Sequence, residues 1–292
     1  MPAEIPEVIA PKTRLLWVLV FAGGAFVITW LTGLAVVLST QAPLVNGAHV
    51  VAHPLALAMP AALTLLVLGG YGPALAALMV TAAASGRTGV RALLGQFRRW
   101  RVGWHWYLLA LLLPSLIALI ALFLWAGFGG QGPGQWFLLP TPLRLAFLAL
   151  GPWGEELGWR GYALPALQQR WRALPASVLV GVLWFGWHQW PLVTPAGPST
   201  IDVGGLLTFL IYIVSASVLF GWLYNSTGGS LPIAWMAHVG LNLNLVATQG
   251  VPFPLITILF AVAAGLVILW NRLHPQSEKR HLSNGRNVRE SQ

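Results

Sequence analysis

The chain has 292 residues, of which 57% are hydrophobic and 8% carry a charge, whereas a soluble domain carries about 25% charged residues. It contains no cysteine, which excludes disulfides and thiolate metal sites. The formal net charge is +9, but there is no RNP-like motif or basic helix, so we expect no nucleic-acid partner. A mean hydropathy of +0.73 indicates a membrane protein.

The apolar segments predict an all-α fold, a polytopic membrane protein with about eight transmembrane helices in one bundle around a polar intramembrane site. In chain order the expected spans are 14–39, 54–84, 104–127, 141–169, 175–190, 204–224, 229–248 and 253–271. The first run is long for a signal peptide and lacks a good cleavage site, so we interpret it as a spanning helix.

Three other segments are expected to differ from straight spanning helices. The second span is too long for one straight crossing, and the glycines and proline at 69–73 predict a break or kink there. Residues 91–107 are rich in arginine and aromatic residues, which is typical of an interfacial segment. The polar stretch 277–292 predicts a disordered tail.

Lysine and arginine occur in alternate loops. They lie before the first span, between the second and third, between the fourth and fifth, and after the eighth. The loops 40–53, 128–140, 191–203 and 249–252 contain none, and the loop 225–228 is neutral and gives no indication. This alternation predicts a multi-pass protein of the plasma membrane with both termini cytoplasmic.

Six polar residues lie inside expected spans, where ionisable groups are costly and mark function. They are Glu155, Glu156, Arg160, His188, His238 and Asn242. Spans four and five form a hairpin, and Glu155 and His188 each lie roughly 20 Å from its turn at 1.5 Å per residue. His238 and Asn242 lie one helical turn apart at a similar depth, so we expect three helices to meet at one polar site.

The spacing assigns different parts to the two adjacent glutamates. Glu156 and Arg160 are four residues apart and are expected to form an ion pair, which leaves Glu155 free for chemistry. Glu155 facing His188 can bind and deprotonate water. His238 with Asn242 can stabilise an oxyanion.

The same groups allow a metal centre, because Glu155, His188 and His238 are ligand types that zinc accepts. The residues do not decide between a divalent metal such as zinc and no cofactor. No HExxH or GxSxG motif is present. Each polar motif taken alone also has a structural interpretation: an ion pair that fixes helix packing, a packed histidine, and interhelical hydrogen bonding.

The motifs EExxxR (155–160), His188 and HxxxN (238–242), in this order, resemble the CPBP family of intramembrane proteases. That family includes type II CAAX prenyl endopeptidases and the Abi or lysostaphin-resistance group. The resemblance covers roughly residues 140–250. The family's second motif is usually FxxxH, and here Trp184 stands four residues before His188, with Phe185 next to it.

The resemblance implies that Glu155 and His188 activate water, that His238 and Asn242 stabilise the oxyanion, and that Glu156 and Arg160 support the site. It implies an intramembrane endopeptidase, of glutamate or metalloprotease type, that matures a membrane-associated peptide or protein. A bacterial source is expected from the arginine- and alanine-rich composition, and a farnesylated CAAX protein is not an expected substrate there.

Two other functions stay open. Buried charges also serve ion- or proton-coupled transporters, although no internal repeat supports one. A non-catalytic immunity-type protein would keep the same fold. We expect the chain to divide into N-terminal helices with the interfacial segment (1–139), catalytic helices (140–250), and a last helix with a cytoplasmic tail (251–292).

Overall fold

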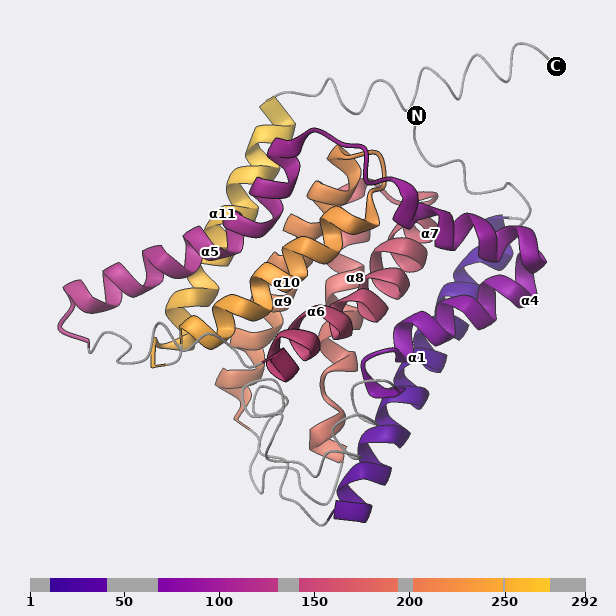
Figure 1. Cartoon of the computed structure of the whole chain (residues 1–292), viewed down its shortest axis with the longest axis horizontal. Coiled ribbons are helices and arrows are strands. Elements are labelled where there is room, and N and C mark those ends of the chain that lie inside the picture. Colours follow the sequence, from indigo (N-terminus) through magenta and orange to yellow (C-terminus); the bar gives the residue numbers. More distant parts are fainter. Residues whose placement is uncertain (1–10, 41–67, 131–141, 194–201, 249, 274–292) are drawn as a thin grey trace.

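Helices make up the regular secondary structure of the described residues, 11–40, 68–130, 142–193, 202–248 and 250–273, in this computed structural model (Figure 1). No strand occurs within these ranges, so the all-α expectation is confirmed. The elements are α1 (Pro11–Thr40), α4 (Gly72–Gly95), η3 (Gln96–Arg98), α5 (Trp104–Gly127), α6 (Pro142–Glu156), η4 (Leu157–Ala163), α7 (Leu164–Gln168), α8 (Ala173–Trp187), η5 (Trp190–Val193), α9 (Val203–Ser226), α10 (Leu231–Ala247) and α11 (Phe253–Leu273).

Four of the described helices are long and apolar enough to cross a membrane. These helices are α1, α5, α9 and α11. By contrast α6 and α8 have 15 residues each and α10 has 17, fewer than the roughly 20 needed to span the hydrocarbon core. The expected boundaries of the spans agree with the observed helices, except that residues 54–67 of the second span lie outside the described residues.

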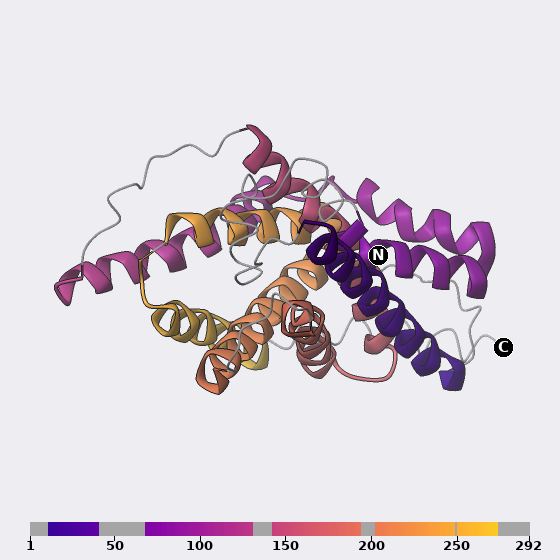
Figure 2. The same ribbon diagram turned by 90° about the horizontal axis from the view of Figure 1, so that it is seen from below.

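The helices form one bundle. In both views α1 and α4 lie together at one end of the molecule and α5 and α11 at the other, with α8, α9 and α10 between them (Figures 1 and 2). The α10 helix packs on α5, α6 and α9, and α8 packs on α9. Helices of the expected N-terminal part therefore contact those of the expected catalytic part directly, and the division into three parts stays a prediction.

The predicted break in the second span is observed as the start of α4. A turn at Gly70 and Tyr71 precedes the helix, and Pro73 occupies its first turn, where a missing N–H does no harm. The helical backbone is interrupted at Gly86 (φ 61°, ψ −157°), two residues after the expected end at residue 84, and a second helical piece follows this kink to Gly95. The predicted interfacial segment therefore begins as the last turn of α4 and continues through η3 into α5.

One feature of the fourth span was not predicted: α6 does not continue as a regular α-helix. Residues 157–163 form the π-helical turn η4, and π-helical turns inside α-helices occur frequently at functional sites. The side-chain amide of Gln96 donates a 2.9 Å hydrogen bond to the carbonyl of Gly161 in this turn. The hydroxyl of Tyr224 in turn donates to the Gln96 amide oxygen at 2.6 Å.

Two glycines on either side of the glutamate pair allow the start of α4 to approach this segment. A Cβ at Gly158 would lie 2.5 Å from the Pro73 Cβ and 2.7 Å from the Pro73 carbonyl carbon. A Cβ at Gly154 would lie 2.8 Å from the ring of Tyr71. This small-residue contact fixes the depth and rotation of the segment that carries the two glutamates.

Candidate active site

A buried cluster of three charged groups joins α6, η4 and α10. The Arg160 guanidinium donates to Glu156 Oε1 at 2.9 Å, which is the ion pair predicted from their spacing. His238 Nδ1 lies 2.8 Å from the same oxygen. The side chains of Glu156 and Arg160 are completely buried, and that of His238 is nearly so. Glu156 therefore binds two cationic or proton-donating partners away from solvent.

The second glutamate lies next to this cluster but has a different partner. Glu155 Oε2 accepts a 2.8 Å hydrogen bond from the indole N–H of Trp184 on α8. Glu155 keeps 8% of its surface exposed, whereas Glu156 keeps none. The two adjacent carboxylates are therefore distinct, as their spacing predicts, since they have different partners and only Glu155 keeps any exposed surface.

His188 caps the C-terminal end of α8 and is half-buried. Its Nδ1 lies 2.8 Å from the main-chain carbonyl oxygen of Trp184, one turn earlier. Aromatic rings surround the imidazole, with centroid distances of 4.8 Å to Trp187, 5.6 Å to Trp184 and 5.6 Å to Phe209. Because a carbonyl only accepts, Nδ1 carries a proton and Nε2 is left to act as an acceptor in the neutral ring.

Glu155 and His188, which are expected to bind one water molecule between them, have different hydrogen-bond partners. Among the residues that the structure describes, no ion pair joins them, and each instead contacts a different part of Trp184. Trp184 therefore links the two residues, through its indole N–H on one side and its main-chain carbonyl on the other.

The two residues expected to bind an oxyanion lie on α10. His238 packs edge-on against Trp184, with ring centroids 5.0 Å apart, and also contacts the ring of Phe220. Asn242 follows one turn later and is half-buried. Because His238 Nδ1 is occupied by Glu156, only its Nε2 is free to meet a substrate.

The proposed metal ligands do not form a ligand set in this arrangement. Within the described ranges, no group of three or more His, Asp or Glu side chains is placed to hold a metal ion. We therefore derive no step through a metal, and the cofactor stays a prediction. Nδ1 of His188 and of His238 contacts a protein oxygen, which leaves Nε2 of each ring as the nitrogen that could bind a metal.

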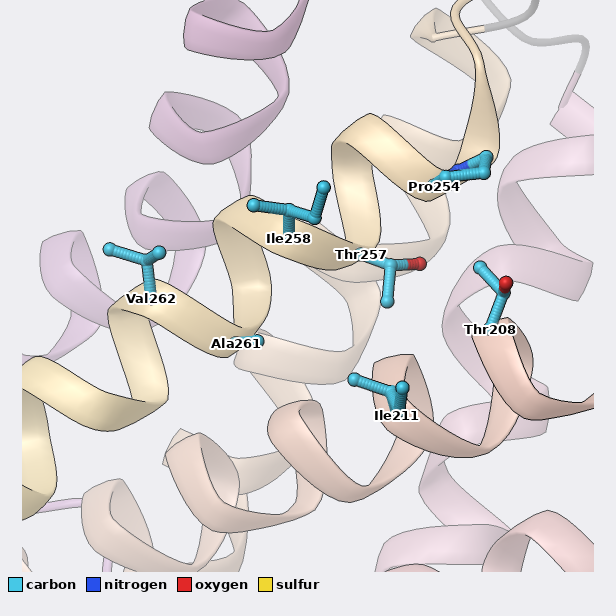
Figure 3. Close-up of a pocket in the computed structure, with 7 residues that line it drawn as sticks. All are labelled: Thr208, Ile211, Pro254, Thr257, Ile258, Ala261 and Val262. Carbon is cyan, nitrogen blue, oxygen red and sulfur yellow. The ribbon is translucent and has the colours of Figure 1, made fainter.

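A groove between α9 and α11 is separate from this site (Figure 3). Its walls are almost entirely apolar, and none comes from α6, α8 or α10. The hydroxyls of its two threonines, Thr208 and Thr257, donate to carbonyls of their own helices. The groove therefore presents no free hydroxyl for a polar ligand.

Sequence reasoning missed Trp184 as a member of the site. The signal was its place four residues before His188, where the resembling family usually has phenylalanine. Its hydrogen bond to Glu155 requires knowledge of how α8 is rotated against α6, which the sequence does not show.

Comparison with known proteins agrees with the position of these motifs. Residues 134–244 match the family described as type II CAAX prenyl endopeptidase Rce1-like, and this range includes all six candidate residues. The protein named CAAX prenyl protease 2 from Methanococcus maripaludis is 31% identical over a stretch that covers 54% of this chain and 63% of that relative. The match thus spans less than two thirds of that relative's length.

Proposed function

We propose that this chain, which belongs through residues 134–244 to the CPBP family of intramembrane proteases, is an endopeptidase that cleaves a membrane-associated peptide or protein. The name of the archaeal relative makes a prenylated CAAX-type protein the first substrate to test. The bacterial source expected from the composition would favour another membrane-associated substrate, and that source stays a prediction because the relative is archaeal.

The observation that carries the proposal is the contrast between the two glutamates. Glu156 is fully buried and bound by Arg160 and His238, whereas Glu155 keeps an exposed edge beside them. Hydrolysis needs a carboxylate that can reach water, next to fixed positive charge that stabilises an oxyanion. A transporter or a purely structural ion pair does not require this asymmetry.

In the proposed reaction, water lies between Glu155 and Nε2 of His188. Glu155 takes one proton as the water oxygen attacks the carbonyl carbon of the scissile peptide bond. The tetrahedral oxyanion accepts hydrogen bonds from His238 Nε2 and from the side-chain amide of Asn242. Glu155 then returns its proton to the leaving nitrogen as the C–N bond breaks, which leaves a free carboxyl and a free amine.

This role requires His238 to carry protons on both ring nitrogens. Nδ1 donates to Glu156, so only a doubly protonated ring can also donate from Nε2. In that state the ring is a cation that donates to Glu156 Oε1 from Nδ1 and to the oxyanion from Nε2.

The test is cleavage by purified protein in proteoliposomes, with membrane peptides identified by mass spectrometry. Glu155→Gln keeps the size of the side chain but removes the base, and we expect a rate loss on the order of 100- to 10,000-fold. Asp202→Asn is the matched control, because Asp202 is exposed and makes no side-chain hydrogen bond as the N-cap of α9. Equal cleavage by the Glu155 variant and the parent protein would refute the proposal.

A further inference from the structure

Trp184 contacts both members of the proposed water-activating pair through two different groups. Its indole N–H donates to Glu155 Oε2 at 2.8 Å, and its main-chain carbonyl oxygen lies 2.8 Å from His188 Nδ1. The residue stands four positions before His188, where the family's FxxxH motif usually has phenylalanine. Its two contacts determine which atoms of Glu155 and His188 stay available, namely Oε1 and Nε2.

The contact to Glu155 decides which carboxylate oxygen faces water. Oε2 is occupied by the indole N–H, so Oε1 is the oxygen left for a water molecule. A hydrogen bond to the charged form of a carboxylate also stabilises that form. A phenylalanine at position 184 would fill similar space but has no N–H to donate.

The indole cannot easily turn away from Glu155. The Trp184 side chain keeps only 1% of its surface exposed. The Arg160 guanidinium lies over the ring at 4.7 Å, and Phe220 lies 6.0 Å away on α9. His238 meets the ring edge-on at 5.0 Å. Groups from three other elements therefore fix the direction of the N–H.

The contact to His188 decides its tautomer. The carbonyl of Trp184 accepts from Nδ1, so Nε2 of the neutral ring carries a lone pair that can accept a hydrogen bond from water. Because this carbonyl belongs to α8, the tautomer depends on the helical backbone. The indole contact depends on the side chain, so the two effects can be separated by substitution.

We propose that Trp184 is a positioning residue for hydrolysis, which holds Glu155 through Oε2 so that Oε1 meets the water bound at His188. This inference rests on the proposed endopeptidase function. It adds a residue to the site that acts through Glu155 and does not itself touch the substrate.

The chain offers a matched control in Trp159. This tryptophan is also fully buried, but its indole nitrogen has no hydrogen-bond partner among the described residues. Trp184→Phe and Trp159→Phe therefore remove the same atoms from two buried sites. Only the first removes a hydrogen bond to the proposed base.

We expect Trp184→Phe to lower kcat on the order of 10- to 100-fold, the range for loss of a hydrogen bond to a charged group, with little change in KM. The acid limb of the pH–rate profile should move to higher pH, because the charged carboxylate has lost a donor that stabilised it. Trp159→Phe should leave the acid limb in place. Thermal unfolding of both variants measures their loss of packing.

An unchanged kcat and pH profile in Trp184→Phe would overturn the inference. So would equal losses in the two variants with unmoved profiles, because the effect would then come from packing. If Trp184→Phe does not fold, replacement of Trp184 by 3-benzothienylalanine gives the same comparison, since sulfur replaces the N–H in a ring of the same shape.

Glu155→Gln in the same assay distinguishes the two proposals. If that variant cleaves as fast as the parent, the proposed function itself fails. If it is inactive while Trp184→Phe behaves like Trp159→Phe, the endopeptidase stands and only the role of Trp184 is lost.

Discussion

His238 Nδ1 and Glu156 Oε1 lie 2.8 Å apart, although 82 residues separate them in the chain. The same oxygen binds Arg160, so one buried carboxylate holds together η4 and α10. Its removal should therefore affect folding before it affects chemistry.

Glu156→Gln should destabilise the protein by about 3–5 kcal/mol, because Arg160 then keeps a buried charge without a counter-charge. Glu155→Gln should change stability little, since the amide oxygen can still accept from Trp184. Chemical unfolding in detergent micelles measures both. If the two variants unfold at the same denaturant concentration, the structural role assigned to Glu156 is wrong.

A second prediction concerns α1, which lies outside the family match but reaches the site. Trp187 packs against His188, and its indole N–H donates to Thr29 Oγ1 at 2.8 Å. That hydroxyl donates in turn to the carbonyl of Gly69 at 2.7 Å. Thr29→Val should cost about 1–3 kcal/mol, because it leaves a buried donor and a buried acceptor unpaired. We also expect a lower kcat, since the ring beside His188 loses its anchor.

Thr32→Val is the control for this prediction. Its hydroxyl donates only to the carbonyl of Ile28 within α1, so the same change in shape breaks no contact between helices. Loss of activity in both variants to the same degree would show that α1 does not act through Trp187.

The close approach of α4 to the glutamate segment predicts the effect of one methyl group. Gly158→Ala places a Cβ 2.5 Å from Pro73 and against its backbone, so the helices must separate. We expect destabilisation of about 1–3 kcal/mol or more from overpacking. Gly265→Ala in α11 meets nothing within 4 Å and should be neutral or slightly stabilising. Thermal unfolding of the two variants checks this contrast.

Metal dependence separates the two mechanisms that the motifs allow. Glu155, His188 and His238 do not form a ligand set as arranged here, so we expect cleavage to continue after dialysis against a strong chelator. Activity lost on chelation and restored by added Zn²⁺ would contradict this expectation. The Asp202→Asn control should respond to the chelator as the parent does.

The sequence predicted most of the helix boundaries because long apolar runs, glycines and prolines determine them locally. It also predicted the ion pair of Glu156 and Arg160, since a spacing of four residues brings side chains together on any helix. It could not predict that Nδ1 of His238 would contact Glu156, because this contact depends on the rotation of α10 against η4. The π-helical turn after Glu156 is likewise a response to packing, with Gln96 bound to a carbonyl in that turn.

Orientation in the membrane is the last prediction, and the absence of cysteine makes it directly testable. The basic loops predict cytoplasmic termini, and alternation of the expected spans then places the connection after α9 on the cytoplasmic side and the end of α5 on the opposite side. Asn225 and Phe128 are exposed at these two ends. A single cysteine at Phe128 should react with a membrane-impermeant maleimide on intact cells, whereas one at Asn225 should react only after the membrane is opened. Labelling of Asn225→Cys in sealed cells would reverse the assigned topology, and with it the side from which substrate reaches Glu155.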